Sequence, residues 1–385
     1  MARWNSREAL AALVAAMLPL AGLASAAPVV ELGRAAVLGH RGTCAERTLS
    51  RLTLSEKVGQ LFMVGVDTVP TSRQLDLVTG YHVGSVLLAH NSSDGVAATR
   101  SRVAALADAA RTGGVQLWVA ADQEGGFVQH LKGPGFSAIP TALAQGTWSP
   151  STLRAQATVW GRQLRDAGVN VDLAPVADTV PASLGAANMP IGYYDREYGH
   201  LPGIVSSHAL AVRDGMQDAH VQTAAKHFPG LGRVHGNTDT TYGVVDATTT
   251  RDGDDALQPF RDLVDDHVPL VMISSALYTR IDPTHVGPMS ATIMRGMLRQ
   301  DMGFDGTVIS DDLTAAALSN VPAPQRALRF LQAGGDVALV GNSTEAASMI
   351  STVLTYARSD EGLHLVDGAA LQVLRTKARE GLLPC

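Results

Sequence analysis

The sequence predicts an α/β protein built as a single (β/α)8 TIM-type barrel. Eight short apolar, β-rich runs alternate with longer stretches rich in Ala, Leu and Arg. This alternation is typical of parallel strands that are buried on both faces and joined by helices. No linker or repeat interrupts the series, which favours closure into a barrel. An open, doubly wound sheet is the alternative, because it is built from the same units.

Each expected element can be placed on the chain. The expected strands are Gln60–Val66, Ser85–Ala89, Gln116–Ala120, Val169–Pro175, Val221–Ala225, Leu270–Ser274, Thr307–Ser310 and Val337–Val340. The expected helices are Gly95–Arg111, Ser151–Ala167, His200–Gln217, Asp254–Asp266, Ser290–Asp301 and Pro324–Ala333. Polar residues gather where strands end: Asp122, Asp172, Asp178, Lys226, His227, Ser274, Ser275, Asp311, Asp312 and Asn342. A barrel carries its active site at this edge, so the pattern predicts an enzyme.

Composition narrows the class of protein. The chain has 385 residues, 46% of them hydrophobic and 17% charged, with a formal net charge of -6. These values are typical of a globular protein with a large core. The mild acidity and the lack of a basic cluster argue against nucleic acid as a partner.

The N-terminus has the features of a secretory signal peptide. Arg3 and Arg7 precede or flank the apolar run Ala9–Leu20, and the small residues Ala24–Ala26 follow it. The run is too short for a membrane span and ends in a cleavage pattern. We therefore expect a signal peptide over residues 1–26, a single domain over 27–385, no transmembrane span after cleavage, and a secreted or cell-envelope location. A buried N-terminal helix is the alternative.

The two cysteines, Cys44 and Cys385, stand near the two ends of the mature chain. An even pair in an exported protein predicts a disulfide, because export disfavours free thiols. Two free thiols remain the alternative.

The adjacent carboxylates Asp311 and Asp312 directly follow the predicted strand Thr307–Ser310. Neighbouring side chains of an extended chain point to opposite sides, so only one of the two can face the barrel mouth. We expect one to be functional and the other structural, for example as a helix cap. Neither His nor Glu stands at ligand spacing, so a metal site is not indicated.

Four segments carry a family resemblance. Residues 297–314 resemble the signature of glycoside hydrolase family 3, and Lys226–Gly232 resembles its Lys-His-Phe-Pro-Gly-x-Gly run. Asp122–Gly126 and the pair Asp195-Arg196 resemble segments of the bacterial β-N-acetylglucosaminidase branch, in its single-domain, secreted actinobacterial type. The four segments occur in the family's order and span essentially the whole mature chain.

The resemblance implies roles for five residues. Asp311 would be the catalytic nucleophile. Asp122, Arg196, Lys226 and His227 would hydrogen-bond the sugar before the scissile bond, where charged partners fix hydroxyl groups most strongly. Without the resemblance, Lys226 could equally be a surface cation and His227 a core histidine.

The expected proton donor departs from the branch pattern of Asp-Ser-His. Counted without gaps from Lys226, Asn237-Thr238-Asp239 stands in that place, with Asp239 at the position of the histidine. If aspartate is aligned with aspartate instead, Asp239 matches the orienting aspartate and Thr241 stands at the position of the histidine. We expect Asp239 to act as acid/base, with His235 as the second candidate, because imidazole suits proton transfer near neutral pH. The alternative is that Asp239 and His235 both belong to a solvated loop and have no catalytic role. Phe127 and His130 also stand where the branch often has arginines.

The resemblance implies a retaining exo-β-N-acetylglucosaminidase, a β-N-acetylhexosaminidase that releases terminal N-acetylglucosamine from peptidoglycan or muropeptide fragments. No metal or organic cofactor is expected, and we expect a monomer whose partner is the carbohydrate substrate. Two alternatives stay open. One is a β-glucosidase of the same family, and the other is a secreted sugar-binding protein that has lost its acid/base.

Overall fold

The computed structural model describes residues 42–110 and 112–385, and Gly42–Cys385 forms one unit. The predicted signal peptide over 1–26 and the predicted start of the domain at residue 27 lie outside the described residues. Within the described part of the chain, no helix is both long and apolar enough to cross a membrane.

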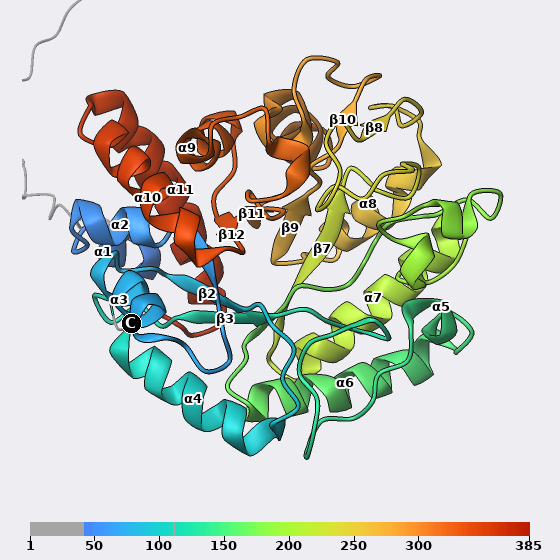
Figure 1. The fold of residues 1–385 in the computed structure, drawn as a ribbon, viewed down its shortest axis with the longest axis horizontal. Helices are drawn as coiled ribbons and strands as arrows, with labels where there is room; N and C mark the ends of the chain where they lie inside the picture. Colours follow the sequence, from blue (N-terminus) through green and yellow to red (C-terminus); the bar gives the residue numbers. More distant parts are fainter. Residues whose placement is uncertain (1–41, 111) are drawn as a thin grey trace, which may run out of the picture. The chain divides into compact units, whose positions relative to one another are not determined.

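Eight parallel strands form the centre of the molecule, and helices surround them (Figure 1). In barrel order the strands are β11 (Thr307–Ser310), β9 (Leu270–Ile273), β7 (Gln222–Phe228), β6 (Val171–Asp172), β3 (Trp118–Ala121), β2 (Ser85–Leu88), β1 (Phe62–Val66) and β12 (Ala338–Val340). Backbone hydrogen bonds also join the two ends of this series: Ser310 N–H donates to Val337 O and Val337 N–H to Val308 O, both at 3.0 Å. The predicted closed barrel is therefore confirmed, and each predicted run contains or overlaps one strand.

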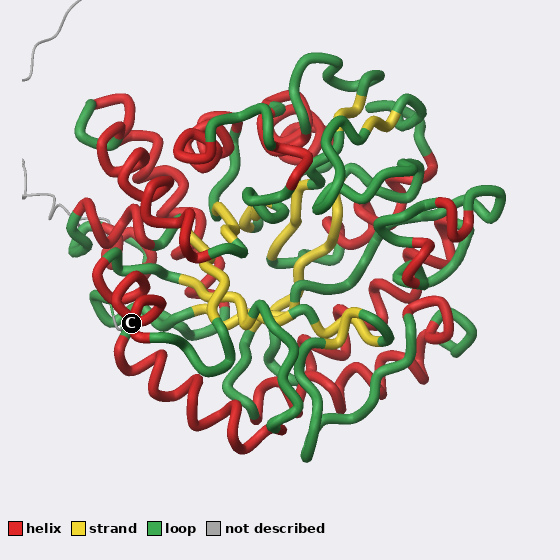
Figure 2. The backbone as a smooth tube through the Cα atoms, viewed as in Figure 1, coloured by secondary structure: helices red, strands yellow, loops and turns green. Residues whose placement is uncertain are grey.

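The connections between strands are helical, as Figure 2 shows by the helices outside the central strands. They are α3 (Ser72–Gly80), α4 (Gly95–Ala109), α6 (Pro150–Asp166), α7 (Pro202–Asp218), α8 (Gln258–Asp265), the π-helical segment η5 (Thr292–Asp301), α9 (Ala323–Ala333) and α10 (Ser343–Tyr356). Each predicted helix corresponds to one of these within a few residues. The fourth begins later than expected, because residues 255–257 form a separate short turn before α8.

Further short elements lie outside the barrel series. The helices α1 (Cys44–Leu49) and α2 (Leu54–Gly59) precede β1, α5 (Ala142–Gln145) precedes α6, and α11 (Asp360–Arg379) ends the fold. Two two-stranded pairs follow barrel strands: β4 (Gln123–Gly125) with β5 (Val128–Gln129), and β8 (Val245–Asp246) with β10 (Leu277–Tyr278). The β4–β5 hairpin directly follows β3, so it contributes to the edge where the predicted site residues gather.

Local sequence signals explain where α1 and α2 begin and why the barrel strands are buried. Thr43 and Thr53 begin α1 and α2 with capping boxes, in which Glu46 and Glu56 bond back to the capping residue. Every residue of β1 and β9 is buried, as expected for parallel strands covered by side chains within and helices outside.

The chain ends are joined by the predicted disulfide. Cys44 at the start of α1 and Cys385 are bonded, with their Cα atoms 5.9 Å apart. Nearby, the buried Lys377 of α11 donates to Gln60 Oε1, Gly84 O and Gln116 O at 2.8–3.1 Å. The last helix is therefore held against the amino-terminal side of β1, β2 and β3.

Candidate active site

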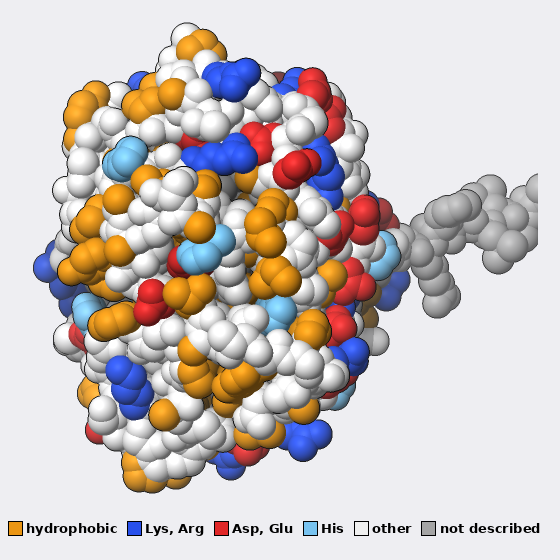
Figure 3. All heavy atoms as spheres, turned by 90° about the vertical axis from the view of Figure 1, so that its right-hand side faces the viewer, with side chains coloured by type: hydrophobic (Ala, Val, Ile, Leu, Met, Phe, Trp, Pro, Cys, Tyr) orange, Lys and Arg blue, Asp and Glu red, His pale blue; other side chains and the backbone are white. Residues whose placement is uncertain are grey.

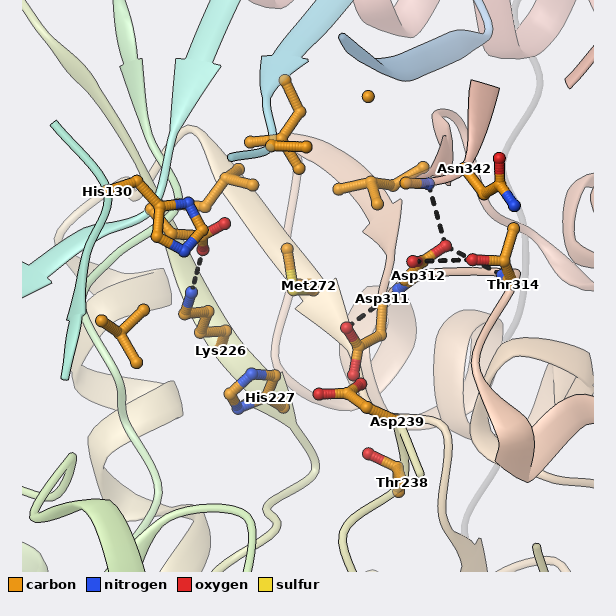
Figure 4. Close-up of a pocket in the computed structure, with 18 of the residues that line it drawn as sticks. His130, Lys226, His227, Thr238, Asp239, Met272, Asp311, Asp312, Thr314 and Asn342 are labelled. Carbon is orange, nitrogen blue, oxygen red and sulfur yellow. Dashed lines mark hydrogen bonds and ion pairs between the residues drawn. The ribbon is translucent and has the colours of Figure 1, made fainter. Parts of the chain in front are cut away.

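A cavity of about 750 Å³ opens at the carboxyl ends of the barrel strands. Its lining includes the predicted residues Asp122, Arg196, Lys226, His227, Asp239 and Asp311. Figure 4 shows several of these side chains around the cavity, with Lys226 on one side and Asp311 on the other. His235 is the one predicted site residue that does not line it.

Lys226 is the centre of an ion-pair network on the cavity floor. It is the fifth residue of β7 and only 2% exposed. Its Nζ lies 2.6 Å from Asp122 Oδ1 and 2.6 Å from Glu124 Oε1. Although burial lowers the pKa of Lys226, the two carboxylates dominate and raise it above its usual value. The ammonium group is therefore charged and fixed in position.

Arg196 extends this network through Glu124. Its guanidinium forms two parallel bonds of 2.8 Å to the Glu124 carboxylate, and it also donates to Pro190 O at 2.7 Å. Burial raises the pKa of Glu124, but the Arg196 and Lys226 charges outweigh burial and keep the net pKa far below its usual value. Glu124 thus holds both cations in place, with its charge fully neutralised.

His227 is oriented by a buried carboxylate. Its Nδ1 lies 2.7 Å from Asp178 Oδ2, and Asp178 also accepts from the backbone N–H groups of His227 and Leu231. Asp178 is completely buried. A carboxyl oxygen that accepts a hydrogen bond at this distance favours the tautomer with the proton on Nδ1, so Nε2 is left free to bond a ligand.

The two adjacent carboxylates after β11 have different surroundings. Asp312 accepts hydrogen bonds from Gly341 N–H (2.9 Å), Thr314 N–H (2.8 Å) and Thr314 Oγ1 (2.8 Å). Within residues 42–110 and 112–385, the Asp311 side chain accepts one hydrogen bond, from the Asp312 N–H to Oδ1 at 2.9 Å. As expected for an extended chain, one carboxylate has a structural role and the other is left available to the cavity.

Asp239 is brought to the nucleophile candidate by the loop after β7. The loop is held against the segment after β11, because Ala316 N–H donates to Asp239 O and Ala317 N–H to Thr238 O, both at 3.0 Å. Figure 4 shows the carboxyl groups of Asp239 and Asp311 facing one another. Burial and the Asp311 charge raise the pKa of Asp239 to about 6. Asp239 is nevertheless exposed as a residue, so solvent in the cavity reaches its side chain.

His235 lies elsewhere on the same loop. It is exposed, and its backbone oxygen accepts from Met189 N–H at 3.4 Å. Of the two acid/base candidates, the fold therefore brings Asp239, and not His235, into the cavity with Asp311.

The sequence pattern alone assigns no role to Glu124 or Asp178, which position the cations and the imidazole. Glu124 lies inside the Asp-Gln-Glu-Gly-Gly segment and Asp178 follows the fourth strand, so both stand at strand ends. That location is the signal that could have found them. Among residues 42–110 and 112–385, no group of three or more His, Cys, Asp or Glu side chains is arranged to hold a metal ion.

Comparisons with known proteins agree on one family. Residues 53–375 match the glycosyl hydrolase family 3 N-terminal domain. The chain is 33% identical over 354 residues to the β-hexosaminidase LpqI of Mycobacterium tuberculosis, covering 87% of this chain and 86% of that protein. A crystal structure of a β-N-acetylhexosaminidase from Beutenbergia cavernae is 46% identical, with a TM-score of 0.83, covering 85% of this chain and 99% of that one. The structure of M. tuberculosis LpqI gives 30% identity, a TM-score of 0.76, and coverage of 87% and 96%.

Proposed function

Because the chain belongs to glycoside hydrolase family 3 and is a glycoside hydrolase, we propose that it is a retaining exo-β-N-acetylglucosaminidase. The observation that carries this proposal is the pair of facing carboxyl groups, Asp239 and Asp311, at the cavity. Retaining glycosidases need a carboxylate nucleophile and a carboxyl group that serves as acid and then as base. The raised pKa of Asp239 suits the second role.

In the proposed first step, an oxygen of the Asp311 carboxylate attacks the anomeric carbon of the terminal sugar. The bond from that carbon to the glycosidic oxygen breaks as a glycosyl-ester bond to Asp311 forms. Asp239 gives its proton to the departing oxygen, so the leaving group departs as a neutral alcohol.

In the second step, the ionised Asp239 takes a proton from water, and the water oxygen attacks the same carbon. The ester bond to Asp311 breaks, which releases the sugar and restores both carboxyl groups. Two inversions at one carbon give net retention of the β configuration.

The ion-paired groups fit a role in holding the sugar before the scissile bond. The buried Lys226 and the half-buried Arg196 are charged and fixed by Glu124, and His227 is fixed by Asp178. Fixed charged donors orient hydroxyl groups with little loss of side-chain entropy when the sugar binds. We propose N-acetylglucosamine as that sugar, supported by the relatives named β-hexosaminidase and β-N-acetylhexosaminidase.

The proposals for the natural substrate and the location of the enzyme rest on the sequence alone. We propose that the enzyme is exported by a signal peptide over residues 1–26 and acts as a monomer on peptidoglycan or muropeptide fragments. The export pattern and the family resemblance support this assignment.

The test is hydrolysis of an aryl β-N-acetylglucosaminide and the matching aryl β-glucoside by the wild type and Asp311→Asn. We expect the wild type to prefer the N-acetylglucosaminide and to release the β anomer first, as followed by proton NMR. Asp311→Asn should lose turnover by at least about 10³-fold, because it removes the nucleophile while keeping the size of the side chain.

Three results would contradict the proposal. Preference for the glucoside would make the protein a β-glucosidase, and initial release of the α anomer would exclude retention. Binding of N-acetylglucosamine without turnover of either substrate by the wild type would indicate a sugar-binding protein.

A further inference from the structure

Three aromatic side chains form a patch on one part of the cavity rim. Phe127 and Tyr193 are 69% and 53% exposed, and Tyr194 lies between them. The ring centroids of Phe127 and Tyr194 are 5.8 Å apart, and those of Tyr193 and Tyr194 are 4.9 Å apart. Aromatic residues make up only 5% of the chain, so three in contact and open to solvent are a concentration that needs an explanation.

The patch is continuous with the catalytic cavity. Phe127 and Tyr194 line the same cavity as Asp239 and Asp311. Figure 3 shows the right-hand side of Figure 1, on which α5 lies. On this face, hydrophobic side chains are interspersed with His, Asp, Glu, Lys and Arg side chains. A ligand that fills the cavity can therefore contact apolar surface without leaving the site.

The backbone presents Phe127 at the tip of the β4–β5 hairpin. Gly125 and Gly126 precede it with φ values of +109° and +55°, a region that side chains other than glycine rarely adopt. This tight turn places the ring beyond the end of the hairpin, toward Tyr194 of the neighbouring loop.

Asn188 ties the tyrosine pair to the loop that carries the proton donor. Its Oδ1 accepts from Ile191 N–H and Gly192 N–H at 3.1 and 2.9 Å, directly before Tyr193. Its Nδ2 donates to Leu231 O and Val234 O, both at 2.7 Å, in the segment that leads to Asp239. Asn188 is completely buried, so the tyrosines have a fixed relation to the start of the acid/base loop.

The patch therefore adjoins the start of the loop that carries Asp239 and lines the same cavity. In the proposed reaction, Asp239 protonates the oxygen that departs, so the departing group lies next to the Asp239 loop. A single N-acetylglucosamine fills only part of a cavity of about 750 Å³, and the remainder must hold what is attached to it.

We propose that Phe127, Tyr194 and Tyr193 form a binding ledge for the second pyranose ring of the substrate, the ring attached through the scissile oxygen. A pyranose presents a face of C–H groups that packs on aromatic rings, and the tyrosine hydroxyls can bond its hydroxyl groups. The ledge is made of neutral side chains, so it would hold a ring by packing and hydrogen bonding and not by charge. This inference rests on the proposed function and names the substrate as a glycan of at least two sugars.

The experiment compares two substrates with the same scissile bond. One is methyl β-N-acetylglucosaminide, which lacks a second ring, and the other is the β-linked disaccharide of N-acetylglucosamine. Aryl glycosides are avoided, because their own ring would stack on the ledge. The readout is the ratio of kcat/KM for the disaccharide to kcat/KM for the methyl glycoside.

We expect Phe127→Leu and Tyr194→Ala to lower this ratio by about 5- to 10-fold, the size expected for loss of one aromatic contact. Phe127→Tyr keeps a ring and should keep the wild-type ratio. Leu363→Ala removes another exposed apolar side chain, on α11 and away from the cavity lining, and should leave both kcat/KM values unchanged.

The outcomes separate this inference from the proposed function. Wild-type hydrolysis of both substrates with an unchanged ratio in Phe127→Leu and Tyr194→Ala would overturn the ledge and leave the function intact. Asp67 lines the cavity directly after β1, whereas Phe127 follows β3 and Tyr194 follows β6. If Asp67→Ala lowered the ratio instead, the second ring would lie near β1 and the ledge would also be overturned. Failure of the wild type on both substrates would overturn the function and the ledge together.

Discussion

The carboxyl group of Asp239 faces that of Asp311, although the two residues stand far apart in the sequence. Burial and the Asp311 charge raise the pKa of Asp239 to about 6. Two carboxyl groups in one site whose surroundings differ are the usual basis for separate acid and nucleophile roles. The pair therefore predicts a specific dependence of the reaction on pH.

The first prediction concerns the alkaline limb of the pH profile. Asp239 must be protonated to act as the acid, so kcat/KM for a substrate with a poor leaving group should fall as the pH rises through about 6. Asp239→Asn should remove this limb and slow the reaction by about 10²–10⁴-fold, because proton transfer is lost. The measurement is kcat/KM against pH for both proteins.

Two controls sharpen this result. A substrate with a good leaving group should show a smaller loss in Asp239→Asn during glycosylation, since departure then needs less protonation. His235→Ala should keep the wild-type profile, because His235 does not line the cavity. A limb that disappears in His235→Ala and persists in Asp239→Asn would transfer the acid role to His235.

The barrel was predictable because its signals are local and repeated. Strands such as Leu270–Ile273 are continuous apolar runs, which are typical of buried parallel strands, and the order of the strands in the barrel follows their order along the chain. The ends of these runs also identified Lys226, Asp311 and Asp122 as candidates. The start of α8 was less predictable, because a short turn and a helix have similar composition.

The network around the site could not be derived in the same way. Whether Glu124 or Asp122 faces Lys226 depends on side-chain directions in the β4–β5 hairpin, and both prove to do so. The choice between Asp239 and His235 depends on how a long loop packs against Ala316 and Ala317, far away in sequence. Such contacts form between segments far apart in sequence, and no pattern within the loop itself predicts them.

The second prediction concerns the buried cation. Lys226→Met leaves the carboxylates of Asp122 and Glu124 with one nearby cation fewer, so we expect a loss of about 3–5 kcal/mol in the free energy of unfolding, besides loss of activity. Urea unfolding followed by circular dichroism measures the loss. Arg154→Met is the control, because Arg154 pairs with Asp214 and Asp218 at the surface and should cost at most about 1 kcal/mol. If both variants lost the same free energy of unfolding, burial of the Lys226 ion pairs would not explain the loss.

The third prediction concerns the Cys44–Cys385 disulfide, which closes a loop of 341 positions. Cys385→Ser should lower the free energy of unfolding by about 2–5 kcal/mol, chiefly because the unfolded chain gains freedom. The bond lies at the chain ends and neither cysteine lines the cavity, so kcat/KM at low temperature should stay at the wild-type value. Unfolding with and without a reductant checks this, since the reductant should destabilise the wild type and leave Cys385→Ser unchanged. A wild type that is insensitive to full reduction would contradict it.

The last prediction follows from Asp172, which is completely buried at the end of β6. Its Oδ1 accepts from Gln123 N–H at 3.1 Å, but its Oδ2 has no hydrogen-bond partner within residues 42–110 and 112–385. Burial raises the pKa of Asp172 to about 7, whereas an unfolded aspartate titrates near 3.9. Between these values the folded protein keeps a proton that the unfolded chain has lost, so this group makes folding less favourable as the pH rises from about 4 to about 7.

Asp172→Asn removes that titration while keeping an oxygen for the Gln123 N–H. Relative to the wild type, we expect its free energy of unfolding to gain about 2–4 kcal/mol between pH 4 and pH 8. Asp218→Asn is the matched control, because the hydrogen bond from Arg154 lowers the pKa of Asp218. That carboxyl group is ionised in both the folded and the unfolded protein above about pH 5, so the Asp218 variant should differ from the wild type by a nearly constant free energy over most of this range. Urea midpoints of the three proteins between pH 4 and pH 8 measure both differences, and a difference from the wild type that is just as constant for Asp172→Asn would contradict the assignment of Asp172 as a buried, protonated carboxyl group.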